Sequence, residues 1–585
     1  LTTGAANTAV GYQSGASLVD GNQNSIFGYN AGYSLTEGIG NTAVGYGALY
    51  GEDDGDYNTA VGYAALNSQT GVSGAVRNTA LGYKAGYAVT TGVRNVIIGT
   101  DAAVGMQDAD ECVIIGNYAM AANATQNGTI AIGRLALSAL TSGAGNVAVG
   151  FEALKTEDAG PGNTALGYQA LETLNNDDGY NVAIGHNAMQ GATTGYYNIC
   201  IGKDTGTSMS GTGSVGTCII IGHEAGDAIN HVDASSTIAI GRSALGALTE
   251  GIGNIGIGYQ SQDANVTGDY NTSVGHQSLG ALNQDGHNAN TAVGYQAALS
   301  LTTATDSTAI GMQALYTEDV GNRSTAIGTQ ALMKQNTASA GNANNTAVGV
   351  FAGYHNVTGT SNTYLGQSVG LGAIGQSNTG NTGVGANALT AVTTGGYNVV
   401  IGNSAGKALT TGGNNVFLGG NAGFATVDVD KAVILGNSAA VSNMTSDADG
   451  TIAVGFDCLS LLTTGRYNTA IGFEALSTTT ETDQNTAIGY QAMKVASGSA
   501  GDLRGTAVGF RSLLSMTSGY GNTSVGAQSG LVLTTGGHNT LLGMNSGTEL
   551  TTASGSVYIG SGAGQANTTG NHNIAIGYDA MGGPI

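Results

Sequence analysis

A short motif that ends in glycine recurs about every 17 residues along this chain. It appears first as Asn-Thr-Ala-Val-Gly-Tyr at Asn7 to Tyr12 and last at Asn573 to Tyr578. Aligned on that glycine, the sequence contains 33 repeats, and 23 of the 32 intervals equal 17 residues. A short period sustained over 585 residues predicts a solenoid, in which each repeat forms one coil and packs only against its neighbours.

The residues before the motif glycine have the chemistry of a β-strand. The residue just before it is Val, Ile or Leu in every repeat except one, which has Phe27, and we name this position the Val/Ile/Leu column. Three before the glycine lies the Thr/Val/Ile column, whose exception is Ser25, and between the two lies a column that is mostly Ala. β-Branched residues at alternating positions are typical of a strand.

Each coil is expected to contain a strand, a glycine corner, a second short strand and a Gly-rich turn. The second strand is placed in a Leu-Thr-Thr-Gly segment, or a near variant, at Leu35 to Gly38, Leu140 to Gly143, Leu409 to Gly412, Leu462 to Gly465 and Leu533 to Gly536. We therefore predict an all-β parallel β-solenoid or β-roll of about 33 coils. It should run over residues 1–585 as one continuous array without a globular domain. Coils stacked about 4.8 Å apart would make it a rod.

Side chains of a strand alternate between two faces, so one face of each coil must point inward. The aliphatic side chains favour an assignment of the Val/Ile/Leu and Thr/Val/Ile columns to the interior. The Ala column, with larger residues at Ile97, Ile114, Tyr364, Phe417 and Tyr558, would then form a flat outer face. Parallel sheets are usually covered on both faces, so this flat face is expected to pack against copies of the same chain.

Composition excludes several classes of partner. Asp and Glu outnumber Lys and Arg 38 to 15, and the net charge of −23 argues against nucleic acid or an anionic membrane. No apolar run is long enough to span a bilayer, and membrane insertion is not expected. One hundred glycines suit a fold with a tight corner in every coil.

Asn-x-Ala-Val/Ile-Gly followed by x-x-Ala/Ser resembles the head repeat of trimeric autotransporter adhesins. The run from Asn163 to Leu171, Asn-Thr-Ala-Leu-Gly-Tyr-Gln-Ala-Leu, is also similar to repeat shafts of bacteriophage tail fibres and of large secreted bacterial surface proteins. The resemblance covers essentially the whole chain. It implies a left-handed parallel β-roll in which three chains pack side by side, and an extracellular location on a cell-surface appendage or a virion.

The two ends of the sequence fall at nearly the same phase of the repeat. Leu1-Thr2-Thr3-Gly4 already belongs to the second segment of a coil, and Ile585 lies eight residues past Gly577. Two interpretations follow: the sequence is a portion of a longer fibre, or chains stack head to tail into a filament.

A column of aromatic or His side chains directly follows the motif glycine. Stacked aromatics could bind surface glycans, but a packing ladder is the favoured interpretation. Its members are Tyr12, Tyr29, Tyr46, Tyr63, Tyr83, Phe151, Tyr168, His186, His223, Tyr259, His276, Tyr295, Phe456, Phe473, Tyr490, Phe510 and Tyr578.

Four acidic segments are expected to be solvated turns: Glu52 to Asp56, Asp108 to Glu111, Asn175 to Gly179, and Asp447 to Gly450. The last has a partial resemblance to a calcium loop but lacks the full spacing with its terminal Glu. The column four before the glycine is Asn in 23 repeats and suits an amide ladder between coils.

The cysteines and the glycosylation motifs add no site. Cys112, Cys200, Cys218 and Cys458 fall on repeat columns, and we interpret them as small apolar fillers. Cys200 and Cys218 lie two columns apart in consecutive coils, about 8 Å, which is too far for a disulfide. Sequons, such as those at Asn123, Asn265 and Asn356, occur in turns and are expected by chance in an Asn- and Thr-rich chain.

No catalytic, cofactor-binding or metal-binding residues are predicted, and the chain is not expected to be an enzyme. The predicted function is that of a non-enzymatic extracellular structural fibre, a rigid shaft or adhesive surface, built as a homotrimer. The alternative is a virion tail-fibre shaft for host recognition. A glycan-degrading spike would need an acidic pair in a groove, which regular coils do not offer. Ice binding by a Thr ladder is disfavoured because the Thr column is expected to point inward.

Overall fold

The structure is a computed structural model, and it describes residues 4–70, 72–210, 213–337, 341–375, 377–496 and 501–583. The expectations for Leu1 to Thr3 and for Ile585 lie outside these ranges. The chain divides into two compact units, Leu1–Ala289 and Asn290–Ile585, and each is described by itself.

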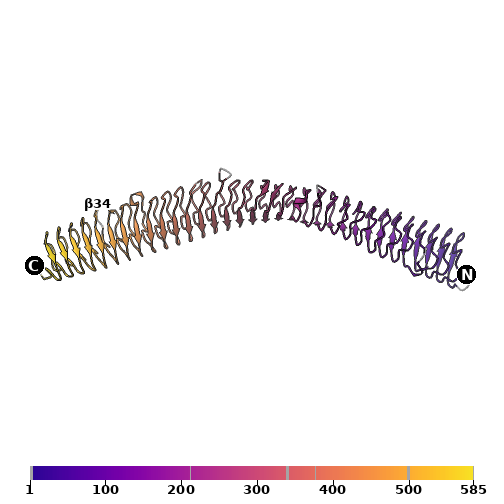
Figure 1. Cartoon of the computed structure of the whole chain (residues 1–585), viewed down its shortest axis with the longest axis horizontal. Helices are drawn as coiled ribbons and strands as arrows, with labels where there is room; N and C mark the ends of the chain where they lie inside the picture. Colours follow the sequence, from indigo (N-terminus) through magenta and orange to yellow (C-terminus); the bar gives the residue numbers. More distant parts are fainter. Residues whose placement is uncertain are drawn as a thin grey trace. The chain divides into compact units, whose positions relative to one another are not determined.

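Each repeat contributes one three-residue strand that ends just before its motif glycine, and there are 33 such strands among the described residues. Figure 1 shows them as successive parallel arrows within each unit. The first unit contains β1 (Thr8–Val10), β2 (Ser25–Phe27), β3 (Thr42–Val44), β5 (Thr59–Val61), β7 (Thr79–Leu81), β8 (Val96–Ile98), β9 (Val113–Ile115), β10 (Ile130–Ile132), β11 (Val147–Val149), β12 (Thr164–Leu166), β13 (Val182–Ile184), β14 (Ile199–Ile201), β15 (Ile219–Ile221), β16 (Ile238–Ile240), β17 (Ile255–Ile257) and β19 (Thr272–Val274). The second contains β21 (Thr291–Val293), β22 (Thr308–Ile310), β23 (Thr325–Ile327), β24 (Thr346–Val348), β25 (Thr363–Leu365), β26 (Thr382–Val384), β27 (Val399–Ile401), β28 (Val416–Leu418), β29 (Val433–Leu435), β30 (Ile452–Val454), β31 (Thr469–Ile471), β33 (Thr486–Ile488), β35 (Thr506–Val508), β36 (Thr523–Val525), β37 (Thr540–Leu542), β38 (Val557–Ile559) and β39 (Ile574–Ile576).

Consecutive strands pair in parallel and in register, so that each sequence column becomes a physical ladder. Between β11 and β12, for example, Ala148 pairs with Ala165 and Val149 with Leu166. Beyond the three-residue strands, the described residues form three pairs of two-residue strands and two single-turn 3-10 helices. These are β4 (Gly55–Asp56) with β6 (Gly74–Ala75), β18 (Gly268–Asp269) with β20 (Gly286–His287), β32 (Thr482–Asp483) with β34 (Gly501–Asp502), η1 (Val232–Ala234) and η2 (Ser446–Ala448). The prediction of an all-β parallel solenoid of about 33 coils is confirmed.

The motif glycine is required by the close approach of one coil to the next. Gly150 has φ +148°, a conformation in which a side chain is strained. A Cβ placed on Gly150 would also lie 2.0 Å from the carbonyl oxygen of Gly167, the same glycine one coil on. The two constraints together explain why this column is glycine in every repeat.

The second short strand of each coil was predicted wrongly. The Leu-Thr-Thr-Gly segments are turns and irregular backbone, as at Leu409 to Gly412. The second and fourth residues after the motif glycine have left-handed backbone in most coils, as Gln169 (φ 52°) and Leu171 (φ 53°) do. Left-handed residues reverse the chain locally and cannot form an extended strand. The coil is therefore one strand followed by a series of tight turns.

The two faces of the strand were also assigned wrongly. In β12 the middle residue Ala165 is buried, whereas Thr164 is half-buried and Leu166 is 46% exposed. The same pattern, a buried middle residue between two outward ones, holds in nearly every strand. The Ala column is thus the interior of the coil, and the Thr/Val/Ile and Val/Ile/Leu columns point outward. Ile97, Ile114, Tyr364, Phe417 and Tyr558 are fully buried.

The interior is too narrow for aliphatic side chains at every strand position. The Ala column packs against a small residue three after the motif glycine and a Leu four after it, such as Ala170 and Leu171, which are both fully buried. Where the Ala column carries a large side chain, the position four after the motif glycine is often glycine instead of Leu. Tyr364 faces Gly370, at which a Cβ would lie 2.4 Å from the ring. Phe417 with Gly423 and Tyr558 with Gly564 follow the same rule. Interior volume is conserved from coil to coil.

Buried amide and hydroxyl groups connect one coil to the next. The Oδ1 atom of Asn41 accepts a hydrogen bond from the backbone N–H of Asn58 at 2.8 Å, and its Nδ2 donates to the carbonyl of Gly55 at 2.8 Å. The predicted Asn ladder is confirmed by this pattern, which recurs along both units. The first Thr of the Leu-Thr-Thr-Gly segment acts similarly, as Thr534 Oγ1 donates to the carbonyl of Thr551 at 3.0 Å. These bonds satisfy polar groups that burial would otherwise leave unpaired.

Candidate functional site: the outward face of the strands

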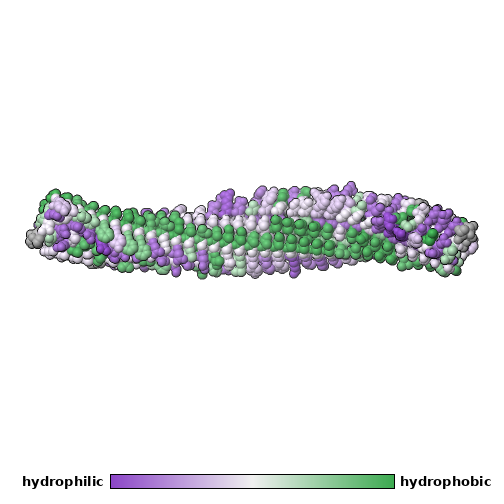
Figure 2. Space-filling model, turned by 90° about the horizontal axis from the view of Figure 1, so that it is seen from below, coloured by the Kyte–Doolittle hydropathy of each residue, from purple (hydrophilic) through white to green (hydrophobic). Residues whose placement is uncertain are grey.

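The two outward columns of the strands form a continuous apolar surface within each unit, which we name the outward strand face. Neither column contains a charged residue in any of the 33 repeats, although the chain carries a net charge of −23. Many of its side chains are well exposed, including Leu81 at 48%, Leu166 at 46% and Leu365 at 47%. Within each unit, Figure 2 shows hydrophobic residues gathered in a stripe. Large exposed apolar patches mark interaction sites.

The aromatic column after the motif glycine forms stacked ladders beside this face. Tyr29 and Tyr46 have ring centroids 5.0 Å apart and an interplanar angle of 3°, and Tyr46 and Tyr63 continue the stack at 5.1 Å. The favoured interpretation as a packing ladder is confirmed. Because each ring face is covered by the next ring, mainly ring edges remain exposed.

Three of the four acidic segments tie coils together through their carboxylates. Asp56 Oδ1 accepts a hydrogen bond from the N–H of Ile39 at 2.7 Å, and Asp110 Oδ1 accepts one from Val93 at 2.7 Å. Asp449 Oδ1 accepts from the N–H of Asp430 at 2.7 Å.

Several other acidic side chains are paired rather than free. Glu111 pairs with Arg94 at 2.9 Å, and Asp447 pairs with Arg466. In the remaining segment, Asn176 Nδ2 donates to the carbonyl of Gly195 at 2.9 Å. Among the described residues, no group of three or more His, Cys, Asp or Glu side chains could hold a metal ion.

Three glutamates lie in the interior, seven after the motif glycine, where most coils have Leu or another apolar residue. Glu318 is satisfied, because its Oε1 accepts from the N–H of Gly321 at 2.8 Å and its Oε2 accepts from Gln335 at 2.7 Å. Glu52 and Glu157 each have a buried Oε2 atom with no hydrogen-bond partner. Burial raises the pKa of Glu52 to about 7 and raises that of Glu157. The expectation that Glu52 lies in a solvated turn is therefore wrong, because its side chain is fully buried. Glu157 and Glu318 were missed, although their replacement of Leu was a visible signal.

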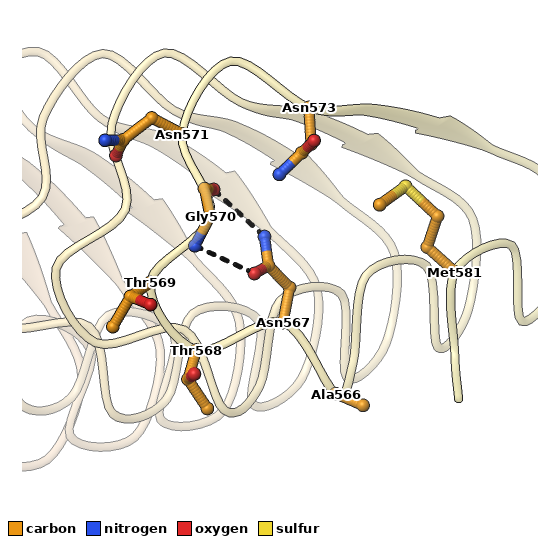
Figure 3. Close-up of a pocket in the computed structure, with 8 residues that line it drawn as sticks. All are labelled: Ala566, Asn567, Thr568, Thr569, Gly570, Asn571, Asn573 and Met581. Atoms are coloured by element: carbon orange, nitrogen blue, oxygen red, sulfur yellow. Dashed lines mark hydrogen bonds between the residues drawn. The ribbon is translucent and has the colours of Figure 1, made fainter. Parts of the chain in front are cut away.

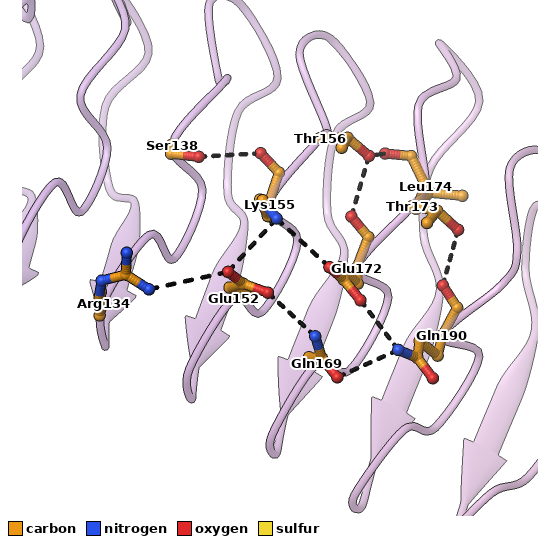
Figure 4. A network of polar contacts seen from close by, with 10 residues as sticks. All are labelled: Arg134, Ser138, Glu152, Lys155, Thr156, Gln169, Glu172, Thr173, Leu174 and Gln190. Atoms are coloured by element: carbon orange, nitrogen blue, oxygen red, sulfur yellow. Dashed lines mark hydrogen bonds and ion pairs between the residues drawn. The ribbon is translucent and has the colours of Figure 1, made fainter.

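A polar network crosses the turns of four coils in the first unit (Figure 4). Lys155 lies 3.4 Å from both Glu152 and Glu172, and Gln169 Nε2 donates to Glu152 at 3.0 Å. The hydrogen bond from Gln169, with a smaller contribution from Lys155, lowers the pKa of Glu152. Both glutamates accept a hydrogen bond from a glutamine amide and lie beside the Lys155 ammonium group, so the network links neighbouring coils.

Two of the pockets that the described residues form differ in their lining. One, of about 420 Å³, is lined by Ala566 to Asn571, Asn573 and Met581. Figure 3 shows amide and hydroxyl groups around it, with Asn567 bonded to the backbone of Gly570. The other, of about 540 Å³, is mostly apolar and includes Lys334, His355 and Ile374. Burial, followed by the charge of Lys334, lowers the pKa of His355.

The cysteines are inert fillers, as predicted. All four are buried and free, and burial raises the pKa of the Cys458 thiol to about 12 and that of Cys218 to about 11. Such thiols are poor nucleophiles at neutral pH.

Two of the sequons named above are closed by the fold. Asn265 and Asn356 are buried, and their side chains bond the backbone of Gly268 and Gly359. Asn123 is exposed.

Fold and surface together define a β-solenoid repeat protein. A search of family models finds none that matches this chain, and a search of curated proteins finds no match in sequence. No helix in the described ranges is both long enough and apolar enough to cross a membrane.

Proposed function

We propose that this protein is a non-enzymatic structural fibre that assembles by packing the outward strand faces of several copies together. The supporting observation is the uncharged apolar face itself. A parallel sheet is usually covered on both faces. Here the narrow interior covers one face, and no described part of the same chain covers the other.

The size of the face supports a stable association. About a third of each outward side chain is exposed, so the ten coils of β8–β17 present on the order of 1,000 Å² of accessible surface per copy. A standard protein–protein interface buries about 800 Å² on each partner. The resemblance to adhesin heads favours three copies around one axis, an extracellular location and a shaft or adhesive role. The resemblance to phage fibres supports a virion shaft as the alternative setting.

The mass of the protein in solution tests this proposal. We expect three times the chain mass of 57.7 kDa by light scattering or sedimentation. Substituting Ile219→Lys and Ile238→Lys places charges on the outward face of β15 and β16, where they would be desolvated between copies. This variant should lose assembly while its circular dichroism stays unchanged. The control Asn230→Lys, in an exposed turn of the same coil, should assemble normally. A monomeric native protein would reject the proposal.

A second candidate function is ice binding, which the outward position of the Thr column favours. The inward orientation that argued against it is wrong: Thr308, Thr325 and Thr346 point outward from successive strands. Thermal hysteresis or inhibition of ice recrystallisation by the soluble protein would support this function. Unchanged activity in a variant with Thr308, Thr325 and Thr346 all replaced by Lys would reject it.

A further inference from the structure

The outward strand face raises a problem of register that the repeat itself cannot solve. Its backbone is nearly identical in every coil, since strand after strand has the same three-residue form and the same buried middle residue. Two copies packed through this face could therefore slide by one coil and regain most contacts. A defined fibre needs features that do not repeat.

Such features exist in the Thr/Val/Ile column, which changes in blocks along the chain. It is Ser or Thr in β1, β2, β3, β5 and β7, Val or Ile in β8–β17 with the single exception Thr164, and Thr in β19 and in β21–β26. It is again Val or Ile in β27–β30, Thr in β31, β33 and β35–β37, and Val or Ile in β38 and β39. In chain order the blocks contain 5, 10, 7, 4, 5 and 2 coils, a series that is not symmetric, so only an unshifted parallel arrangement brings every block opposite itself.

Thr164 is the sharpest of these features. It lies in β12 with Val147 paired on one side and Val182 on the other, so its hydroxyl interrupts an aliphatic ladder. It is half-buried and points outward. In a dry interface its hydroxyl would lose water, and a Val or Ile opposite could not replace that hydrogen bond. The same residue of another copy could, as cross-strand Thr pairs do in sheets.

We propose that Thr164 and the boundaries between Thr and aliphatic blocks fix the copies parallel and in register. The principle is the one by which a single polar residue in an apolar seam sets the register of a coiled coil. A shift by one coil mismatches Thr164 and the rows at each block boundary, and larger shifts or an antiparallel arrangement mismatch more. The inference rests on the proposed assembly through the outward strand face, and it adds how that assembly is aligned.

Disulfide trapping tests the register, because the four native cysteines are fully buried and will not compete. Val147→Cys and Val182→Cys introduce outward thiols two coils apart, beyond disulfide reach in an aligned assembly. The two variants are refolded together, oxidised, and analysed by mass spectrometry of the linked peptides. A slip of two coils would bring position 147 of one copy opposite position 182 of another. We expect links from 147 to 147 and from 182 to 182, and almost none from 147 to 182.

Removing the hydroxyl should loosen the alignment. In a Thr164→Val background we expect the same assembled mass but a several-fold rise in the 147-to-182 product. Thr193→Val makes the same chemical change in an exposed turn and should leave the pattern unchanged. Equal yields of aligned and shifted links in an assembled native protein would overturn the register proposal and leave the proposed function standing. A monomer by mass would overturn both.

Discussion

The interior of the coil and its outward strand face are built on the same three-residue strands, yet they obey different rules. Inside the coil, close packing limits the size of each residue, so the large Tyr364 side chain lies against Gly370, which has no side chain. Outside, the Thr/Val/Ile column is Val or Ile in every strand of β8–β17 except β12, and Thr in β21–β26, without any change in strand length. Interior residues therefore determine stability, and outward residues are free to encode assembly.

The largest expected effect is at the motif glycine. Gly150→Ala introduces a Cβ 2.0 Å from the carbonyl oxygen of Gly167 at φ +148°. We expect a loss of about 4 kcal/mol, at the upper end for single substitutions. Gly145, five residues earlier, has φ +72° and no atom within 4 Å of its Cβ position. Gly145→Ala should cost only about 1 kcal/mol. Amide hydrogen exchange in β11 and β12 measures both, and equal losses would contradict the close-approach argument.

Because interior residues compensate for one another in volume, a second substitution should restore stability that a first one removes. Tyr364→Ala should destabilise its coil by about 3 to 5 kcal/mol, because it leaves a cavity and removes the hydrogen bond from its hydroxyl to Asn378. Gly370→Leu alone should also destabilise, through overlap with the ring. The double variant restores the ordinary Ala and Leu pair, as at Ala165 and Leu171, and should recover most of the loss. Additive losses in urea unfolding would argue against volume matching.

Glu52 predicts a pH dependence that arises inside the coil. Its pKa is raised from 4.5 to about 7 in the folded state, mainly by desolvation. The folded state therefore holds the proton more tightly than the unfolded state. The contribution of Glu52 to the free energy of unfolding is largest below pH 4.5, falls as the pH rises toward 7, and is constant above it. The total loss is roughly 3 kcal/mol. Glu52→Gln should flatten this part of the profile in local hydrogen exchange. An unchanged slope in that variant would reject an interior carboxyl as the cause.

The smallest effect on stability is expected for an outward side chain of a strand, and a larger effect for the buried side chain beside it. Thr325→Val changes an outward side chain of β23 and should alter stability by at most about 0.5 kcal/mol. Ala326→Leu, one residue on, enlarges a fully buried side chain in the packed interior of the coil and should cost about 1 to 3 kcal/mol. Thermal unfolding of the two variants compares the faces directly. A larger cost for Thr325→Val would reverse the assignment of the faces.

Much of the fold could be predicted from the sequence, because the period, the β-branched columns and the Asn column each have a local physical meaning. Which strand columns point into the coil could not be predicted. Alternation along the strand allows either the Ala column or its two neighbours to be interior, and the larger size of the aliphatic side chains favoured the wrong choice. The missed signal was the pairing of large Ala-column residues with a downstream glycine, as in Phe417 with Gly423. Left-handed Leu171 was also unpredictable, because nothing in a Leu side chain favours that backbone. One continuous array over residues 1–585 and the absence of an active site stay predictions.

An electron cryomicroscopy map of the native protein tests the central claim most directly. In cross-section, the account predicts several chains whose Val, Ile and Thr outward side chains meet at the centre, with the Ala column enclosed inside each coil. A map of single chains, or of chains that touch through another surface, would contradict it.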